Sequence, residues 1–429
     1  MPDSAKTHKP TPWVDAILPF NIAFGPVSTL IQILILNLNG SVIDVALAIT
    51  LFNAVGVPAA IVWGFVTDRF HKRKLIIIAS YVATAAILFA FLFANTGYLV
   101  SLLYAAFSFI TSAATTPLNL LVMETERKQK WATAFARFSM ITSIGQTTGL
   151  IISVGWGLFF PLTYLVVPLA VLSIVSSILS VYMIKEPSIV FERQAIVMNK
   201  QSFFHRILAI PFLFLRIPRL NDFKRVFRTI KYELTRQAPI LYFSIFMFYL
   251  ASGLFNTSIV PSLRANNVSS FLIFLVTTVA MVVQIISFRY AGPYTERKSP
   301  VKAQVGGLIL RSLGYGLLGV SLYIISGVAF LAPVVVLYPL AAGFAYSIYY
   351  TASNTMVFNS LRNGRQGSSL GVYSALVGIA TLLGSLVSGF TSFFLGFAIT
   401  FLIAAIFLGV AAWLASLLEN PKLSQSKES

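Results

Sequence analysis

The sequence predicts an all-α membrane protein with twelve transmembrane helices in two pseudo-symmetric six-helix halves. The first observation is the composition: of 429 residues, 57% are hydrophobic and 10% are charged, and the mean hydropathy is +0.84. Soluble domains carry about a quarter charged residues, so most of this surface needs lipid as its solvent. The second observation is a set of long apolar runs, and the third is an internal repeat.

Twelve apolar runs are long enough to cross a bilayer as helices. The hydrocarbon core requires about 20 consecutive apolar residues in helical form, because unpaired backbone polar groups are costly in lipid. We interpret the first run as a retained helix, since it is longer than the apolar region of a signal peptide. The runs are 16–37, 41–66, 75–95, 98–122, 133–159, 162–184, 239–261, 269–291, 303–325, 328–352, 369–394 and 397–418.

The basic residues predict how the spans are oriented. All but two of the 31 Lys and Arg lie in the terminal tails, in alternate loops or at the helix ends of those loops; the exceptions are Arg264 and Arg311. Basic residues collect on the cytoplasmic side, so we expect both termini in the cytoplasm and the chain in the cell (plasma) membrane. The net charge of +18 therefore reflects topology and anionic lipid, and does not indicate a nucleic-acid partner.

One long connection, 185–238, separates an N-terminal half, 1–184, from a C-terminal half, 239–429. It contains 11 Lys and Arg and four acidic residues. Within it, Asn221 or Asp222 can cap a helix with one apolar side and basic residues on the rest. Such a helix is expected to lie on the inner leaflet and to bind anionic lipids; a solvated linker is the alternative.

The two halves repeat one another. At an offset of 235 residues, the Phe20-Asn21 pair returns as Phe255-Asn256, and Asn119 returns as Asn354. Polar and proline matches in the same order are stronger evidence than apolar matches, because apolar helices resemble one another by composition. Two parallel six-helix repeats are typical of secondary carriers, in which the solute site lies near the midplane between the repeats.

The segment from Gly64 to Lys74 contains Asp68-Arg69 followed by a basic cluster. It resembles the signature of the loop between helices 2 and 3 in the major facilitator superfamily, with His71 in place of the usual second glycine. By topology the resemblance covers essentially the whole chain. It implies a secondary carrier that works by alternating access, without a cofactor, and usually as a monomer.

The resemblance also implies a gate on the cytoplasmic side. The carboxylate of Asp68 would face the start of the eleventh span, where free backbone N–H groups and the helix dipole favour an anion. Arg69 could reach Glu124 or Glu126 at the end of the fourth span. The alternative is that these are turn residues and topological charges only. The predicted gate residues are Gly64, Asp68, Arg69, Arg73, Glu124 and, in the second copy, Gly292, Glu296 and Arg297.

Polar residues in the spans predict the path of the solute. The superfamily lines its path with spans 1, 4, 7 and 10, which here carry a repeat-related set of four amides near the inner mouth. These amides could bind solute or could equally stabilise helix crossings. The predicted path residues are Asn21, Asn53, Asn119, Gln146, Tyr249, Asn256, Gln284, Tyr346 and Asn354.

Charged residues in the spans are few. No Asp or Glu lies in the middle third of any span, so no buried carboxylate relay is predicted. Asp44, near the outer face, is an interfacial charge, a coupling group, or one half of an outer latch with Arg264. Arg311 lies well inside the ninth span; we expect snorkelling or a helix-end contact in preference to solute contact.

Taken together, the residues predict a carrier of a small organic solute, with efflux of amphipathic or anionic compounds favoured. Uptake of a sugar or organic acid is the alternative, and an integral-membrane enzyme is remote. The chain has no cysteine, and its three histidines lie in polar flanks. No catalytic cluster, metal site or cofactor is therefore predicted. The glycines of the fifth span, such as Gly145 and Gly149, are expected to serve helix packing.

Overall fold

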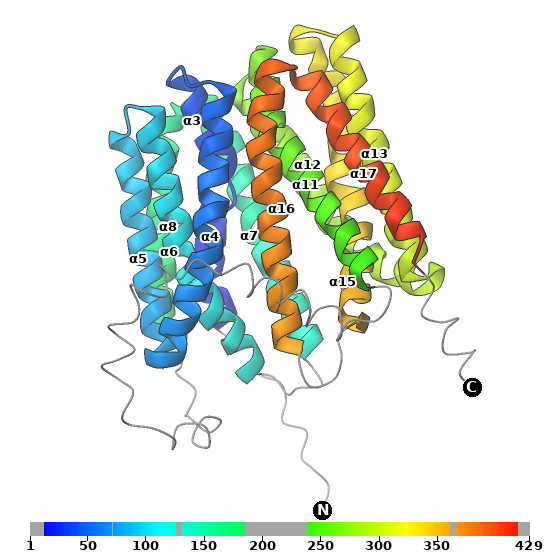
Figure 1. The fold of residues 1–429 in the computed structure, drawn as a ribbon. Coiled ribbons are helices and arrows are strands. Elements are labelled where there is room, and N and C mark those ends of the chain that lie inside the picture. The colour runs from blue at the N-terminus through cyan, green and yellow to red at the C-terminus, as the bar shows by residue number, and fades with distance from the viewer. Residues whose placement is uncertain (1–12, 71, 126–130, 185–237, 361–365, 419–429) are drawn as a thin grey trace, which may run out of the picture.

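The computed structural model describes residues 13–70, 72–125, 131–184, 238–360 and 366–418. Every regular element in these ranges is a helix (Figure 1). The first half contains α1 (Trp13–Ala16), α2 (Leu18–Phe24), α3 (Val27–Asn37), α4 (Val42–Phe70), α5 (Arg73–Ala90), η1 (Phe91–Phe93), α6 (Gly97–Thr125), α7 (Trp131–Phe159), η3 (Leu162–Leu165) and α8 (Val166–Met183). The predicted linker lies outside the described residues, apart from its last position.

The second half contains α11 (Ala238–Ala265), α12 (Ser270–Lys298), α13 (Pro300–Ile324), η5 (Gly327–Phe330), α14 (Leu331–Tyr338), the π-helical η6 (Pro339–Ala345), α15 (Tyr346–Ser360), α16 (Gln366–Phe394) and α17 (Phe397–Ser416). Within the described residues, eleven stretches are long and apolar enough to cross a membrane. Packed among them is α7, a further helix of 29 residues. The predicted all-helical membrane architecture with twelve long helical segments is confirmed.

Two of the spans lose regular α-helical geometry at a proline. The first is divided into α2 and α3 at Gly25-Pro26. The tenth changes to π-helical geometry at Pro339, between α14 and α15. Proline lacks the backbone N–H that would continue the ladder, and π-helical turns frequently occur at functional sites.

The helices of each half pack mainly against one another. In the first half, α4 packs on α6, and α5 packs on α6 and α8. In the second half, α11 packs on α16 and α17, and α13 packs on α15 and α17. Contact between the halves is made where α4 meets α16 and α7 meets α12, with smaller contacts from α11 to α3 and α4. Figure 1 shows α4 in blue beside α16 in orange at the centre of the molecule.

Glycines permit the closest helix crossings. A Cβ on Gly149 of α7 would collide with the carbonyl oxygen of Ile22 in α2, and one on Gly384 of α16 would collide with that of Leu250 in α11. A Cβ on Gly145 would lie 2.7 Å from that of Asn21. The packing role predicted for Gly145 and Gly149 is confirmed. The two related crossings, α2 with α7 and α11 with α16, are built the same way in both halves.

We refer to the end of the molecule with the turns 38–41 and 266–269 as the upper end, following Figure 1. The opposite, lower end contains the C-terminal ends of α4, α6, α12 and α15. Many large apolar side chains on the outside are exposed, for example Phe93 at 75% and Ile324 at 77%. Exposed apolar surface on this scale fits a lipid surrounding.

Candidate functional site

Arg311 is the twelfth of the 25 residues of α13, and therefore lies at mid-helix. Its side chain is 3% exposed and is the one buried charged side chain among the described residues. The predicted snorkelling is wrong. Because Arg311 is on the side of α13 that faces α11 and α15, its guanidinium points into the second half rather than towards a membrane surface.

Three aromatic rings form a cage around this guanidinium. The centroids lie 4.8 Å (Phe248, α11), 5.1 Å (Tyr315, α13) and 5.3 Å (Tyr346, α15) from the guanidinium carbon. Arg311 Nε also donates a hydrogen bond of 2.9 Å to the hydroxyl of Tyr315. Ring faces attract cations within about 6 Å, most strongly where water is excluded. We call these four residues the arginine cage.

The arginine cage leaves polar atoms without a partner. Nη1 of Arg311 is buried and has no hydrogen bond within the described part of the chain. Gln304, two helical turns earlier on the same face of α13, is fully buried, and neither its amide nitrogen nor its amide oxygen has a partner there. Buried polar atoms are nearly always paired with protein, water or a ligand, so this part of the second half has capacity to bind a further group.

Tyr346 joins the arginine cage to side chains nearer the surface. Its ring stacks on that of Tyr350, with centroids 5.5 Å apart, and both rings meet Phe288 of α12 edge-on. Tyr350 is 39% exposed. The predicted path residue Gln284 lies one turn before Phe288, and its backbone carbonyl accepts a hydrogen bond of 3.0 Å from Ser347.

Two further predicted path residues meet through a tyrosine that the sequence did not single out. The hydroxyl of Tyr373 in α16 donates a hydrogen bond of 3.4 Å to Oδ1 of Asn354 in α15, and its side chain interacts with that of Tyr249 in α11. Asn256 is seven residues after Tyr249 and therefore shares its helix face. Asn256 is exposed although it lies inside α11.

The amides of the first half are arranged differently. Asn21 is 8% exposed, and its Nδ2 donates a hydrogen bond of 2.9 Å to the carbonyl of Ile17 in its own helix. Asn53 does the same to Ile49 at 3.0 Å. Asn119 and Gln146 are half-buried. No hydrogen bond of the described residues joins any two of Asn21, Asn119, Asn256 and Asn354, so the proposed ring of four amides stays a prediction.

At the upper end the structure gives Asp44 and Arg264 separate partners. Oδ2 of Asp44 accepts hydrogen bonds from the backbone N–H (2.7 Å) and the hydroxyl (2.8 Å) of Ser41. Asp44 therefore caps the N-terminus of its own helix, α4. Nη2 of Arg264 donates a hydrogen bond of 2.9 Å to Oδ1 of Asn37. The described residues therefore do not contain the Asp44–Arg264 pair, although Arg264 does bridge the two halves.

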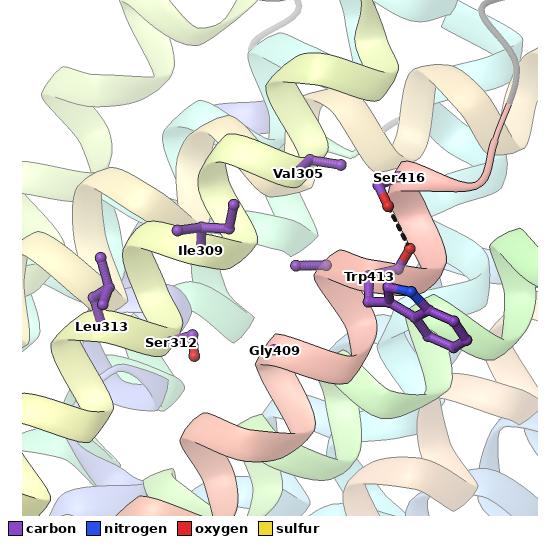
Figure 2. Close-up of a pocket in the computed structure, with 8 residues that line it drawn as sticks. Val305, Ile309, Ser312, Leu313, Gly409, Trp413 and Ser416 are labelled. Atoms are coloured by element: carbon purple, nitrogen blue, oxygen red, sulfur yellow. Dashed lines mark hydrogen bonds between the residues drawn. The ribbon is translucent and has the colours of Figure 1, made fainter.

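The surface groove in Figure 2 lies away from these residues. It has a volume of about 280 Å³ and is lined by α13 and α17, among others by Ile309, Leu313 and Trp413. Its two hydroxyls are already used, since Ser312 donates to the carbonyl of Ala405 and Ser416 to that of Trp413. The groove is apolar and faces outwards, so it does not belong to the path between the halves.

Comparison with known proteins identifies the family. The model of the Major Facilitator Superfamily matches residues 16–227 and 241–429. The chain belongs to the major facilitator superfamily. It is a multi-pass membrane protein and a secondary transporter of small solutes, not an enzyme.

Solved structures of other members of the superfamily share the fold at low identity. A mutant of the nucleoside transporter NupG is 15% identical with a TM-score of 0.68, covering 95% of this chain and 98% of that one. A mutant peptide transporter POT in complex with alafosfalin is 12% identical with a TM-score of 0.69, covering 95% of each chain. Among curated proteins, none matches this sequence. These likenesses confirm the predicted superfamily fold.

The predicted gate of this superfamily member lies at the lower end. Gly64, Asp68 and Arg69 are in the last turns of α4, Glu124 ends α6, and Glu296 is in the last turn of α12; their side chains lie outside the described residues. Arg73 begins α5, and Arg297 is exposed. Gly292 has no atom within 4 Å of where a Cβ would stand. The backbone thus carries these residues to one end, and their pairing stays a prediction.

Proposed function

We propose that this superfamily member transports small organic solutes with an anionic or amphipathic character by alternating access. The observation that carries the proposal is the distribution of charge. Each acidic residue in the described helices lies within four residues of a helix end, whereas Arg311 is buried at mid-helix. These acidic residues are Asp15, Asp44, Asp68, Glu124 and Glu296. A cationic solute would lack a buried acid as its partner.

The path that we propose runs between the halves along α11, α15 and α12 on one side and α2, α4, α6 and α7 on the other. Its support in the second half is the connected set Tyr249, Tyr373 and Asn354, together with the exposed Asn256 on the Tyr249 face of α11. Hydroxyls and amides at these positions would hydrogen-bond a polar solute, and the aromatic rings would contact its apolar part.

Opposite ends of the path would close in turn. The bond between Arg264 and Asn37 supports an upper closure, since it joins the end of α11 to the end of α3. We propose that Asp68 and its neighbours form the lower closure. Upper contact between the halves is also close at Gly389 of α16, where a Cβ would lie within 3.5 Å of the Cα of Ile43 in α4.

We further propose export as the direction of transport, a cell-membrane location with both termini in the cytoplasm, and a monomer whose basic linker contacts anionic lipids. Export is supported by the family resemblance alone. Uptake of an organic acid or sugar is the second candidate, and the same acid-free membrane centre favours an organic acid over a cationic nutrient.

Thermal unfolding of the detergent-purified protein against a solute panel tests the solute class. The panel contains aromatic and aliphatic anions, their neutral amides, cationic dyes and sugars, each at two pH values. A ligand that binds the native state raises the apparent melting temperature by mass action. Stabilisation by anions supports the proposal. Stabilisation by cations alone, or by a sugar alone, contradicts it.

A further inference from the structure

We propose that Arg311 is the anion-binding residue of the transporter and that the arginine cage receives an aromatic carboxylate or sulfonate. This inference deepens the proposed function and depends on it. Its starting point is a guanidinium that is buried at the middle of α13 and has no acidic partner among the described residues. Burying a charge without a partner costs free energy. An anionic ligand that pairs with Arg311 would offset that cost.

The geometry leaves Nη1 of Arg311 available to a ligand. Nε is occupied by the Tyr315 hydroxyl, which fixes the plane of the guanidinium, while Nη1 has no partner. The rings of Phe248 and Tyr346 contact its faces. An oxygen of a carboxylate or sulfonate would accept a charge-assisted hydrogen bond from this Nη1. Rings beside that nitrogen would contact the aromatic part of the same ligand.

The internal repeat shows that the fold does not require a cation at this position. In the second half Phe255 stacks on Tyr315 at 3.6 Å; in the first half Phe20 stacks on Tyr81 at 4.3 Å. The residue four positions before the stacked tyrosine is Arg311 in the second half and Ile77 in the first half. Ile77 is fully buried in an apolar cluster. The equivalent place is thus filled by hydrocarbon in one half and by a charge in the other.

Access to the cage would pass by Tyr346. This residue is half-buried, contacts Arg311 on one side and stacks on the exposed Tyr350 on the other. It immediately follows the π-helical segment η6. A π-helical turn holds an extra residue that can shift back to α-helical geometry, and such turns frequently mark functional sites. Rotation of Tyr346 would open Arg311 to the path between the halves.

The test uses benzenesulfonate as the anion and benzenesulfonamide as a neutral molecule of nearly the same shape. Thermal unfolding is followed for the whole purified protein, for Arg311→Met and for Lys302→Gln. Lys302 is an exposed cation in the first turn of the same helix. Lys302→Gln therefore removes one positive charge, as Arg311→Met does, but leaves the arginine cage intact. We expect benzenesulfonate, but not benzenesulfonamide, to stabilise the wild type and Lys302→Gln.

For Arg311→Met we expect half-saturation by benzenesulfonate to shift by about tenfold to a hundredfold, as for loss of a hydrogen bond to a charged group. Its melting temperature without ligand should equal or exceed that of the wild type, because a buried charge has been replaced by an apolar chain of similar volume. Should that variant not fold, Arg311→Lys, which keeps the charge but lacks the planar fork, should bind roughly tenfold more weakly than wild type.

Retained benzenesulfonate binding in Arg311→Met would overturn the inference and leave the transporter proposal standing. A wild type that benzenesulfonate does not stabilise would also overturn it. If other anions of the panel still stabilise the protein, only the cage assignment fails; if only cations or sugars do, the proposed solute class fails as well.

Discussion

Nη2 of Arg264 lies 2.9 Å from Oδ1 of Asn37, and this hydrogen bond joins the two halves at the upper end. Arg264 is exposed, so the bond is worth only about 0.2–1 kcal/mol. A contact of that size suits a closure that has to open in every transport cycle. A buried bond of several kcal/mol would hold the upper end shut.

Removing this bond should increase access from the upper end. The chain contains no cysteine, so Asn256→Cys introduces one label site on the exposed face of α11. We expect Asn37→Ala to raise the rate at which a membrane-impermeant maleimide labels this cysteine about two- to fivefold, in line with a bond of up to 1 kcal/mol. Asn95→Ala, at an exposed turn within the first half, is the control. Equal rates in the two variants would show that the bond does not hold the halves together.

The glycine crossings give a prediction for stability. Gly149→Ala and Gly384→Ala each place a methyl group against a backbone carbonyl of the neighbouring helix, and overpacking of this kind costs about 1–3 kcal/mol. Gly155→Ala is the matched control, because no atom lies within 4 Å of its Cβ position. The melting temperature of the purified variants measures the difference. If Gly149→Ala and Gly155→Ala lowered the melting temperature equally, contact with the neighbouring helix would not be the cause.

Tyr315 gives a prediction that separates orientation from charge. Tyr315→Phe keeps the ring over Arg311 but removes the hydroxyl that accepts from Nε. We expect benzenesulfonate to bind about three- to tenfold more weakly, the equivalent of roughly 1 kcal/mol. Titration by thermal shift measures it, with Tyr290→Phe on the exposed side of α12 as the control. Unchanged affinity would mean that the hydroxyl does not orient the guanidinium.

Asp68 tests the lower gate. Asp68→Asn removes the charge that is expected to dock on a helix start, so we expect transport to fall at least tenfold while the protein still reaches the membrane. Asp15→Asn, at an exposed position of α1, is the control for loss of one carboxylate. Transport rates in vesicles, normalised to the amount of protein, give the comparison. Unimpaired transport in Asp68→Asn would refute the gate.

The fold was predictable because it depends on patterns in the sequence, namely apolar runs, turn residues and an internal repeat. Apolar runs and turn residues placed all twelve spans, although α12 and α15 continue seven and eight residues beyond the predicted ends at 291 and 352. The Phe20 and Phe255 repeat has a direct counterpart in two aromatic stacks. The break at Pro26 and the π-helical segment after Pro339 were not foreseen, since both depend on how a helix packs after its ladder is interrupted.

The site was less predictable, because side-chain direction is set by three-dimensional packing. Tyr249 and Asn354 were expected on the path and belong to the connected set, and Tyr346 was expected there and belongs to the arginine cage. Asn21 and Asn53, by contrast, donate hydrogen bonds to their own helices. Arg311 was expected to reach a surface, because the ninth span is peripheral in the superfamily that the sequence resembles. A signal was nevertheless present: Tyr315 is one turn after Arg311 on the same span, and Phe248 and Tyr346 are aromatic residues within other spans of the same half.

The most direct test of transport is counterflow in sealed proteoliposomes. Vesicles containing the purified protein are loaded with unlabelled benzenesulfonate and diluted into radiolabelled benzenesulfonate, with protein-free vesicles and Arg311→Met as comparisons. We predict transient accumulation of label in loaded wild-type vesicles, abolished when unlabelled anion is absent inside and strongly reduced in Arg311→Met. Stabilisation of the protein by benzenesulfonate without any flux above protein-free vesicles would contradict the account and indicate a binding protein that does not transport.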